Sequence, residues 1–403
     1  MSGPIALYVH IPFCAARCPY CDFATAPATS ALRSRYLAAL NAEIRSEGLA
    51  VGHPAARTLY LGGGTPSLLE PDEIGRLGAA LRDSFDLCLV EATVEANPAT
   101  LDRARLEAWA AIGVTRLSLG AQTFSDRGLR ELGRTHQSED VEPAMRAARS
   151  LGLAVSLDLI FGWPGQTLEE WRADLAAASA LVPDHISCYP LELVLEPEEA
   201  VANWPGGGWP TVRRWRERAA RTQPPDEDVA RMYRVAERAL KGTGYRHYEI
   251  ANWALPGKRC EHNLTYWRNG EWLGLGAGAH THLRGRRSSR PASLVAYLDA
   301  IEGGRPRIAD PSAEEASDTA MLALRLDDGL DLAAYGTRFG PAIEARVRAA
   351  LATTAGLGLV RWSDTVAWLT PRGRLLASEV FVRLLDGDDA PTSAARSDVL
   401  AAT

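Results

Sequence analysis

Residues 8–23 read YVHIPFCAARCPYCDF, a short strand pattern that leads directly into three cysteines within eight positions. Cys14, Cys18 and Cys21 have the spacing Cys-x3-Cys-x2-Cys, whereas the other three cysteines are scattered. Three thiolates from one loop can hold three corners of a [4Fe–4S] cluster and leave the fourth iron open. A zinc site needs a fourth Cys or His at a second spacing, and His10 lies on the strand, where we expect it to be packed or hydrogen-bonded. The loop therefore predicts an iron–sulfur site.

Five further strand patterns follow the first, and amphipathic helix patterns separate them. The expected strands are 6–11, 58–63, 91–96, 116–122, 154–162 and 185–193. Strands that alternate with helices indicate βαβ units and a parallel sheet, and six units fall short of the eight that close a full barrel. We expect an α/β fold, a partial (β/α)6 barrel, with its site at the C-terminal ends of the strands.

The rest of the chain is expected to differ from the barrel. Residues 196–228 are rich in Pro, Gly, Trp and Arg and predict an irregular insertion. We expect its arginines to form a solvated helix face; the alternative is that they meet carboxylates. Helix patterns followed by a hairpin pattern at 357–373 predict a mostly helical, winged-helix-like module, and the polar stretch 284–293 suggests a boundary before it. The expected parts are a core barrel over 1–245, an extension over 246–290 and a C-terminal module over 291–403.

Composition and charge indicate an ordinary soluble protein. Hydrophobic residues make up 46% and charged residues 23% of the 403 positions. No apolar run predicts a transmembrane segment, and the first residues lack the pattern of a secretory signal. The formal charge of −6 gives no electrostatic reason to expect nucleic acid, although winged-helix modules often bind DNA. Six sparse cysteines predict reduced thiols and a cytoplasmic location.

The cysteine loop on the first strand of a βα-alternating chain resembles the radical SAM superfamily. That resemblance implies S-adenosylmethionine (SAM) on the open iron, cleaved by an electron from the cluster to methionine and a 5′-deoxyadenosyl radical. A narrower resemblance, to the anaerobic coproporphyrinogen III oxidase group, covers nearly the whole chain. It rests on YVHIPFC (8–14), CDF (21–23), GGGTPSLL (62–69), VEANP (94–98), GAQTF (120–124), LGRTH (132–136), DLIFGWPGQT (158–167), HNLTYW (262–267) and LGLGAGAH (273–280).

In that group the matching positions contact SAM. Glu95 and Asp158 can accept hydrogen bonds from ribose hydroxyls, and Arg134 can pair with a carboxylate. An aromatic ring at Tyr20 can cover a purine, and bare glycine backbone permits a close approach to the methionine moiety. The resemblance carries the SAM-binding role to Tyr8, Gly63, Gly64, Thr65, Glu95, Gln122, Arg134 and Asp158.

Two features select a branch within the group. Members that oxidise coproporphyrinogen carry a further cysteine two positions after the third ligand, where this chain has Phe23. Residues 262–267 form an HNxxYW motif. Both features are similar to the HemW-type haem chaperones, which implies that the chain binds haem and delivers it to acceptor haemoproteins. We predict that His262 ligates the haem iron while Tyr266 and Trp267 pack on the macrocycle.

Other interpretations stay open from the sequence. A buried histidine that satisfies local hydrogen bonds is the alternative for His262, and His280 with His282 form a second candidate pair for haem. The same barrel motifs serve the coproporphyrinogen III oxidase itself and related carbon methyltransferases and cyclopropanases. Whether the chain is an enzyme is therefore undecided, and HNxxYW together with residues 324–332 favours the chaperone branch.

Overall fold

The computed structural model describes residues 3–193, 209–312 and 314–385. One twelve-stranded sheet organises this part of the chain, in the order β14-β13-β12-β11-β1-β4-β5-β6-β7-β8-β10-β9. Its six central strands run parallel and are the six that the sequence predicts, which confirms the partial (β/α)6 barrel. They are β1 (Ile5–Ile11), β4 (Ala55–Gly63), β5 (Asp86–Ala96), β6 (Arg116–Gln122), β7 (Ala154–Phe161) and β8 (His185–Pro190).

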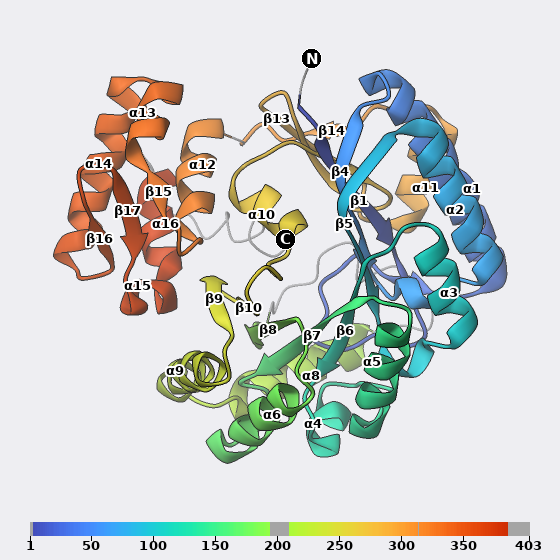
Figure 1. Ribbon diagram of the computed structural model, residues 1–403, viewed down its shortest axis with the longest axis horizontal. Coiled ribbons are helices and arrows are strands. Elements are labelled where there is room, and N and C mark those ends of the chain that lie inside the picture. Colours follow the sequence, from blue (N-terminus) through green and yellow to red (C-terminus); the bar gives the residue numbers. More distant parts are fainter. Residues whose placement is uncertain (1–2, 194–208, 313, 386–403) are drawn as a thin grey trace.

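Helices cover the outer face of this curved sheet, while its inner face is open to the rest of the chain (Figure 1). Alternate strand residues explain the division: Leu7 and Val9 are buried in the core under α1, whereas Tyr8 and His10 point the other way. The inner face is therefore polar and aromatic. The outer helices are α1 (Ser30–Val51), α2 (Pro71–Ser84), α3 (Arg103–Ala111), α4 (Asp126–Glu131), α5 (Val141–Ser150) and α6 (Leu168–Ala180).

Short strands extend the sheet at both edges. The parallel strand β11 pairs with β1, and the antiparallel strand β10 pairs with β8. The stretch 284–293, where the sequence suggests a boundary, contains a strand of this sheet. Arg290 within this stretch is buried and forms ion pairs with Glu43 and Glu47. The added elements are β9 (Arg246–Glu249), β10 (Asn252–Ala254), β11 (Trp272–Leu275), β12 (His280–Leu283), β13 (Arg286–Ser289), α11 (Leu294–Glu302) and β14 (Ile308–Ala309), with a separate pair β2 (Phe13–Cys14) and β3 (Ala26–Pro27) in the cysteine loop.

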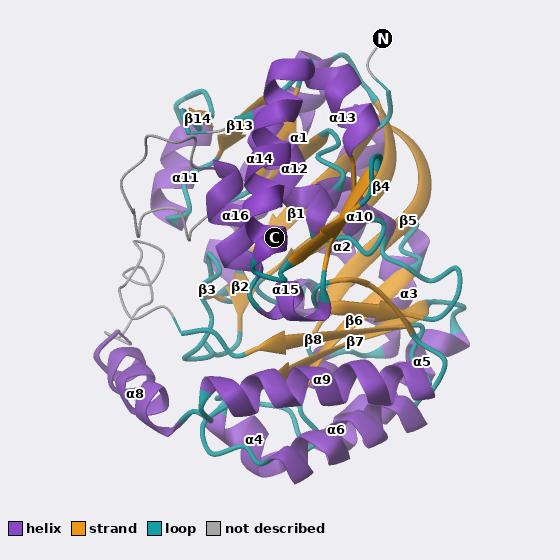
Figure 2. Ribbon diagram, turned by 90° about the vertical axis from the view of Figure 1, so that its left-hand side faces the viewer, coloured by secondary structure: helices purple, strands orange, loops and turns teal. Residues whose placement is uncertain are grey.

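Residues 196–228 are not wholly irregular, because they include α8 (Trp209–Thr222) and the start of α9 (Asp226–Gly242); positions 194–208 lie outside the described residues. Helix α9 packs beside α6 (Figure 2). Arg216 on α8 is 1% exposed and pairs with Asp22 at 2.5 Å, so the expected solvated arginine face is wrong at this position. The alternative, that an arginine of the insertion meets a carboxylate, holds there.

The C-terminal region is mostly helical with a small hairpin sheet, as the sequence predicts. It has a hydrophobic cluster of its own, to which Leu264 and Trp267 of α10 (Glu261–Trp267) also belong. In Figure 1 α10 lies between the barrel and this module. The module contains α12 (Glu315–Leu324), β15 (Leu330–Asp331), α13 (Leu332–Phe339), α14 (Pro341–Gly356), β16 (Val360–Trp362), β17 (Val366–Leu369), α15 (Pro371–Leu375) and α16 (Ala377–Leu385).

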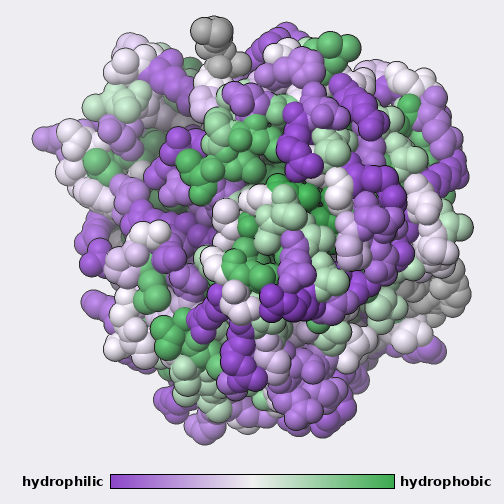
Figure 3. Space-filling view, turned by 45° about the vertical axis from the view of Figure 1, so that its right-hand side comes forward, coloured by the Kyte–Doolittle hydropathy of each residue, from purple (hydrophilic) through white to green (hydrophobic). Residues whose placement is uncertain are grey.

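The described helices include none that is long and apolar enough to cross a membrane. On the face drawn in Figure 3, hydrophilic residues surround scattered patches of hydrophobic ones. Such a mixture is usual for the exposed surface of a globular protein.

Candidate functional site

The cysteine loop leaves the C-terminal end of β1 and presents three partly exposed thiols. None of them is in a disulfide, and two receive hydrogen bonds: Thr65 Oγ1 lies 3.6 Å from Cys14 Sγ, and Arg134 Nη1 lies 3.7 Å from Cys18 Sγ. Donors aimed at sulfur are one of the ways a protein tunes an iron–sulfur cluster. Three thiols on one loop, two of them with a hydrogen-bond donor, are a donor set of the kind that iron–sulfur clusters use, and their assignment to a cluster stays a prediction.

Burial changes the ionisation of two of these thiols. It raises the pKa of Cys14 to about 11 and that of Cys21 to about 12, although the Thr65 hydrogen bond acts in the opposite direction on Cys14. Metal ligation requires thiolates, and a bound iron supplies the positive charge that drives off the protons. The loop is therefore suited to binding iron with release of protons.

Two carboxylates lie on the inner face of the sheet, on β5 and on β7, with β6 between these two strands. On β5, Glu95 accepts a hydrogen bond from the Tyr60 hydroxyl at 2.9 Å and another from the Gly63 amide at 2.8 Å. Burial raises the pKa of Glu95 to about 7, and the nearby Asp158 adds to this. On β7, Asp158 accepts hydrogen bonds from Ser118 and Ser187 at 2.9 and 2.7 Å, and burial raises its pKa as well.

The glycine motif after β4 is packed against the cysteine loop. Gly63 has φ +112°, and a Cβ there would lie 2.4 Å from the His10 ring. A Cβ on Gly64 would lie 2.6 Å from backbone atoms of Pro12. Because Gly63 and Gly64 have no side chains, the end of β4 can lie close to the segment that precedes Cys14. Its contact with a methionine moiety stays a prediction.

Gln122 and Arg134 complete this end of the barrel. Gln122 has φ +64°, at a β-bulge where the pairing of β6 with β7 shifts, and such strain gathers at functional sites. Arg134 donates to Gly120 O at 3.0 Å and to Cys18 Sγ, but its buried Nε has no hydrogen-bond partner among the described residues. An unsatisfied guanidinium N–H beside the cysteine loop fits a carboxylate ligand.

Two aromatic residues are predicted to contact SAM: Tyr8 on β1 and Tyr20 within the cysteine loop. The Tyr8 hydroxyl is 3.0 Å from His10 Nδ1, and His10 Nε2 is 2.8 Å from Ala24 O. Because a carbonyl only accepts, Nε2 carries the proton and Nδ1 accepts from Tyr8. His10 is thus hydrogen-bonded, as predicted, and burial lowers its pKa to about 4. Tyr20 packs against a small apolar cluster that includes Leu132.

The structure does not support the prediction that His262 ligates haem. The side chain is fully buried, with Nδ1 2.9 Å from Thr58 Oγ1 and Nε2 2.7 Å from the Tyr266 hydroxyl. Both ring nitrogens are occupied, and burial lowers the pKa to about 3. The buried, hydrogen-bonded alternative describes this histidine.

The rings beside His262 are also covered by protein. Tyr266 packs edge-on against Trp272 with ring centroids 4.8 Å apart, and the Arg325 guanidinium lies 4.4 Å from the Trp267 ring centre. Neither ring is thus open on both faces for a macrocycle. Of the second pair, His282 is buried and bonded to Gly270 O, whereas His280 is exposed.

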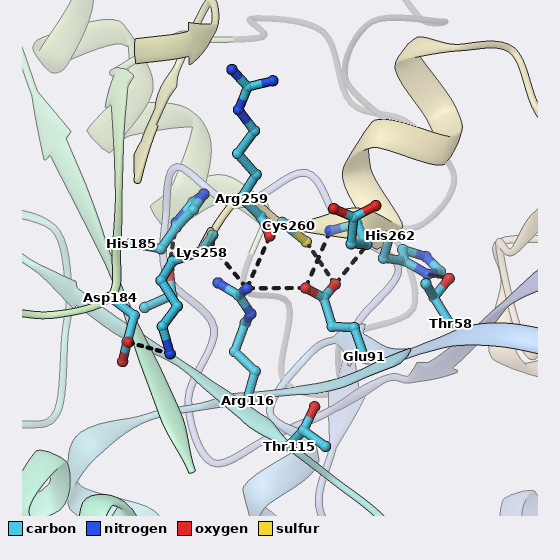
Figure 4. A network of polar contacts seen from close by, with 12 residues as sticks. Thr58, Glu91, Thr115, Arg116, Asp184, His185, Lys258, Arg259, Cys260 and His262 are labelled. Atoms are coloured by element: carbon cyan, nitrogen blue, oxygen red, sulfur yellow. Dashed lines mark hydrogen bonds and ion pairs between the residues drawn. The ribbon is translucent and has the colours of Figure 1, made fainter. Parts of the chain in front are cut away.

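The sequence did not reveal a buried ion pair at the opposite end of the barrel interior. Glu91 and Arg116 meet at 3.0 Å, and Figure 4 shows them pointing toward each other between the sheet and α10. Glu91 also accepts hydrogen bonds from the amides of Glu261 and His262 and from the Cys260 thiol. A charged residue in the middle of β5 and another at the start of β6 are the signal in the sequence for this pair.

Comparisons with known proteins agree with the barrel and the C-terminal module described above. Residues 8–178 match the Radical SAM superfamily model, and residues 311–376 match the HemN C-terminal domain. The chain is 35% identical to the heme chaperone HemW of Bacillus subtilis (strain 168) over 93% of its own length and 97% of that protein. For HemW of Mycobacterium tuberculosis (strain H37Rv), identity is 35% over 95% of both chains.

A solved structure shares the architecture. Coproporphyrinogen III oxidase (HemN) from Escherichia coli, described as a radical SAM enzyme, superimposes with a TM-score of 0.79 over 95% of this chain and 90% of that one. The identity is 23%, so this likeness concerns the fold. With both domains matched and relatives aligned over almost their full length, the chain belongs to the HemW-type family of radical SAM proteins.

Proposed function

We propose that this protein is a haem chaperone that binds a [4Fe–4S] cluster and SAM, takes up haem and transfers it to acceptor haemoproteins in the cytoplasm. The observation that carries the proposal is the alignment with proteins named heme chaperone HemW, which spans 93% of this chain and includes both the cysteine loop and the C-terminal domain. Phe23, in place of the additional cysteine expected for an oxidase, supports the same branch. The six free cysteines suit a reducing compartment.

We assign the cluster to Cys14, Cys18 and Cys21. The hydrogen bond from Thr65 favours the thiolate form of Cys14, and Arg134 donates to Cys18 Sγ. When bound, the reduced cluster supplies the electron that cleaves the sulfonium of SAM.

We assign SAM to the same end of the barrel. The unsatisfied Nε of Arg134 is suited to the carboxylate of SAM, and Glu95 with Asp158 are suited to ribose hydroxyls. The remaining proposed contacts are Tyr8, Tyr20, Gly63, Gly64, Thr65 and Gln122.

Haem is part of the proposal without an assigned iron ligand. His262 does not fit that role in this conformation, because Thr58 and Tyr266 occupy both of its nitrogens. His280 is exposed on β12. It is therefore the histidine to substitute first in a search for the ligand.

The test is anaerobic reconstitution of the cluster, followed by haem titration and a coproporphyrinogen III decarboxylation assay in parallel. Stoichiometric haem binding, transfer to a haem-depleted acceptor and no porphyrinogen turnover are expected. Turnover near the ~1 s⁻¹ lower end of typical enzymes would overturn the chaperone assignment in favour of the oxidase. Transfer of a SAM methyl group to carbon, without haem binding, would favour the methyltransferase alternative.

A further inference from the structure

The HNxxYW segment forms α10, a short helix with two differently occupied faces. His262 and Tyr266 are one turn apart and face the barrel, where they contact β4 and β11. Leu264 and Trp267, three positions apart, belong to the hydrophobic cluster of the C-terminal module. The helix therefore joins the two parts of the molecule.

On the barrel side, His262 supports the aromatic ring that holds Glu95. The rings of His262 and Tyr60 are 5.1 Å apart between centroids and inclined by 31°, and Thr58, two positions before Tyr60 on β4, bonds to His262 Nδ1. The Tyr60 hydroxyl in turn donates to Glu95 Oε1 at 2.9 Å. A change at His262 thus reaches Glu95 through one intervening side chain.

The same stack continues to the cysteine loop. Tyr60 lies against Tyr8 with centroids 6.3 Å apart and planes inclined by 26°. The Tyr8 hydroxyl bonds to His10, and His10 bonds to the carbonyl of Ala24, three residues after the last cysteine of the loop. The inner face of β1 and β4 therefore carries a continuous series of ring contacts from α10 to the loop.

On the other side, α10 is fixed by charges. The buried Glu91–Arg116 pair holds the start of the helix: Glu91 accepts its first amides, and Arg116 donates to the carbonyls of Lys258 and Arg259, as Figure 4 shows. At the far end, the guanidinium of Arg325 from the C-terminal module lies over the Trp267 ring. These contacts at both ends of α10 hold the helix in the orientation in which His262 faces the barrel.

We propose that His262 is a positioning residue for SAM binding: it holds Tyr60, and through Tyr60 it holds Glu95, and it is not the haem ligand. The inference rests on the proposed assignment of SAM to Glu95. The motif then serves to fix α10 between the SAM end of the barrel and the C-terminal module. Removal of the His262 side chain lowers the affinity for SAM and leaves the affinity for haem unchanged.

The test uses the full-length reconstituted protein with His262→Ala, His262→Gln and Tyr60→Phe, and measures SAM affinity by equilibrium dialysis and haem affinity by Soret titration. Tyr60→Phe removes only the hydroxyl that reaches Glu95 and keeps the packed ring. We expect His262→Ala and Tyr60→Phe each to weaken SAM binding by about fivefold, the effect of losing one hydrogen bond of about 1 kcal/mol. His262→Gln, which can still bond to one of the two hydroxyls, should recover part of the loss.

The matched control is His185→Ala. His185 is also buried, and its nitrogens lie 2.8 Å from the hydroxyls of Ser156 and Tyr248, but it has no contact with Tyr60 or Glu95. It should lower stability as His262→Ala does and leave SAM affinity unchanged. A further measurement separates positioning from general loss of structure. Because the Tyr60 hydrogen bond lowers the pKa of Glu95, Tyr60→Phe should shift the midpoint of the pH dependence of SAM binding to higher pH.

Three results would overturn the inference. One is unchanged SAM affinity in both His262→Ala and Tyr60→Phe while the parent protein binds SAM. Another is loss of haem binding in His262→Ala with SAM affinity retained, which would restore the haem-ligand role. The third, no SAM binding by the parent protein itself, would overturn the proposed SAM site together with this inference and is distinguishable because it precedes any substitution.

Discussion

SAM binding should depend on pH through Glu95. Ribose hydroxyls need an ionised acceptor for the stronger, charge-assisted hydrogen bond, and burial raises the pKa of Glu95 to about 7. The carboxylate is then about 10% ionised at pH 6 and about 90% ionised at pH 8. If only the ionised form binds well, SAM affinity rises by about tenfold over this range, which corresponds to about 1.4 kcal/mol.

The other groups near Glu95 limit what else can titrate in this window. His10 and His262 have pKa values lowered by burial to about 4 and about 3, so both stay neutral from pH 6 to 8. Burial raises the pKa values of Tyr8 and Tyr60 well above 10. Burial also raises the pKa of Asp158, whose charge acts on Glu95, so Asp158→Asn measures the share of Asp158 in the pH dependence.

The measurement is equilibrium dialysis of SAM against the reconstituted protein at pH 6, 7 and 8, with calorimetry in two buffers of different ionisation enthalpy. At pH 7, binding should release about half a proton per SAM. Glu95→Gln should bind more weakly at pH 8 and show no slope. A parent protein whose affinity is constant from pH 6 to 8, or a Glu95→Gln variant with the same slope, would refute the role of Glu95.

The other predictions concern the cluster and the supports of the site. Changing Cys14, Cys18 or Cys21 to Ala should abolish the iron and sulfide content, whereas Cys88→Ala should not; a triple variant that keeps its iron would exclude the assignment. Glu91→Ala should lower the free energy of unfolding in urea by about 3–5 kcal/mol, because it leaves the Arg116 charge buried and unpaired. Its control, Glu107→Ala, breaks an ion pair of similar length whose side chains are 70% and 52% exposed and should cost about 0.5 kcal/mol or less; equal losses would contradict the reasoning. Arg216→Ala removes donors to Pro19 O and Asp22 in the cysteine loop and should reduce iron retention on gel filtration, while Arg213→Ala on the exposed face should not.

Local patterns explain how much of the fold the sequence predicts. The six central strands show apolar residues at alternate positions, because one face of each packs under helices, and the cysteine spacing is a local property of one loop. The short strands β9 to β14, which extend the sheet on both sides, were not predicted because they have two to four residues each, too few for a pattern. They also depend on the chain returning to the barrel.

At Arg216 and His262 the difference from the expected surroundings has the same origin. Whether Arg216 faces solvent depends on Asp22, 194 positions away, and whether His262 has a free nitrogen depends on Thr58, 204 positions away. Both partners are remote in the sequence, so the residues near Arg216 or His262 contain no trace of them. A motif shared with a haem-binding family predicted a ligand, and tertiary packing provides different partners.

Ligation of haem and support of Glu95 require different positions of the His262 imidazole. To reach an iron atom, His262 must break at least one of its bonds, to Thr58 or to Tyr266, and move away from Tyr60. Each buried hydroxyl left without a partner costs about 1–3 kcal/mol, and the loosened Tyr60 weakens its hydrogen bond to Glu95. Haem on His262 would therefore lower SAM affinity, and by thermodynamic reciprocity SAM would lower haem affinity by the same factor. SAM dissociation constants that are equal with and without bound haem fit the positioning role, whereas mutual antagonism would place haem on His262.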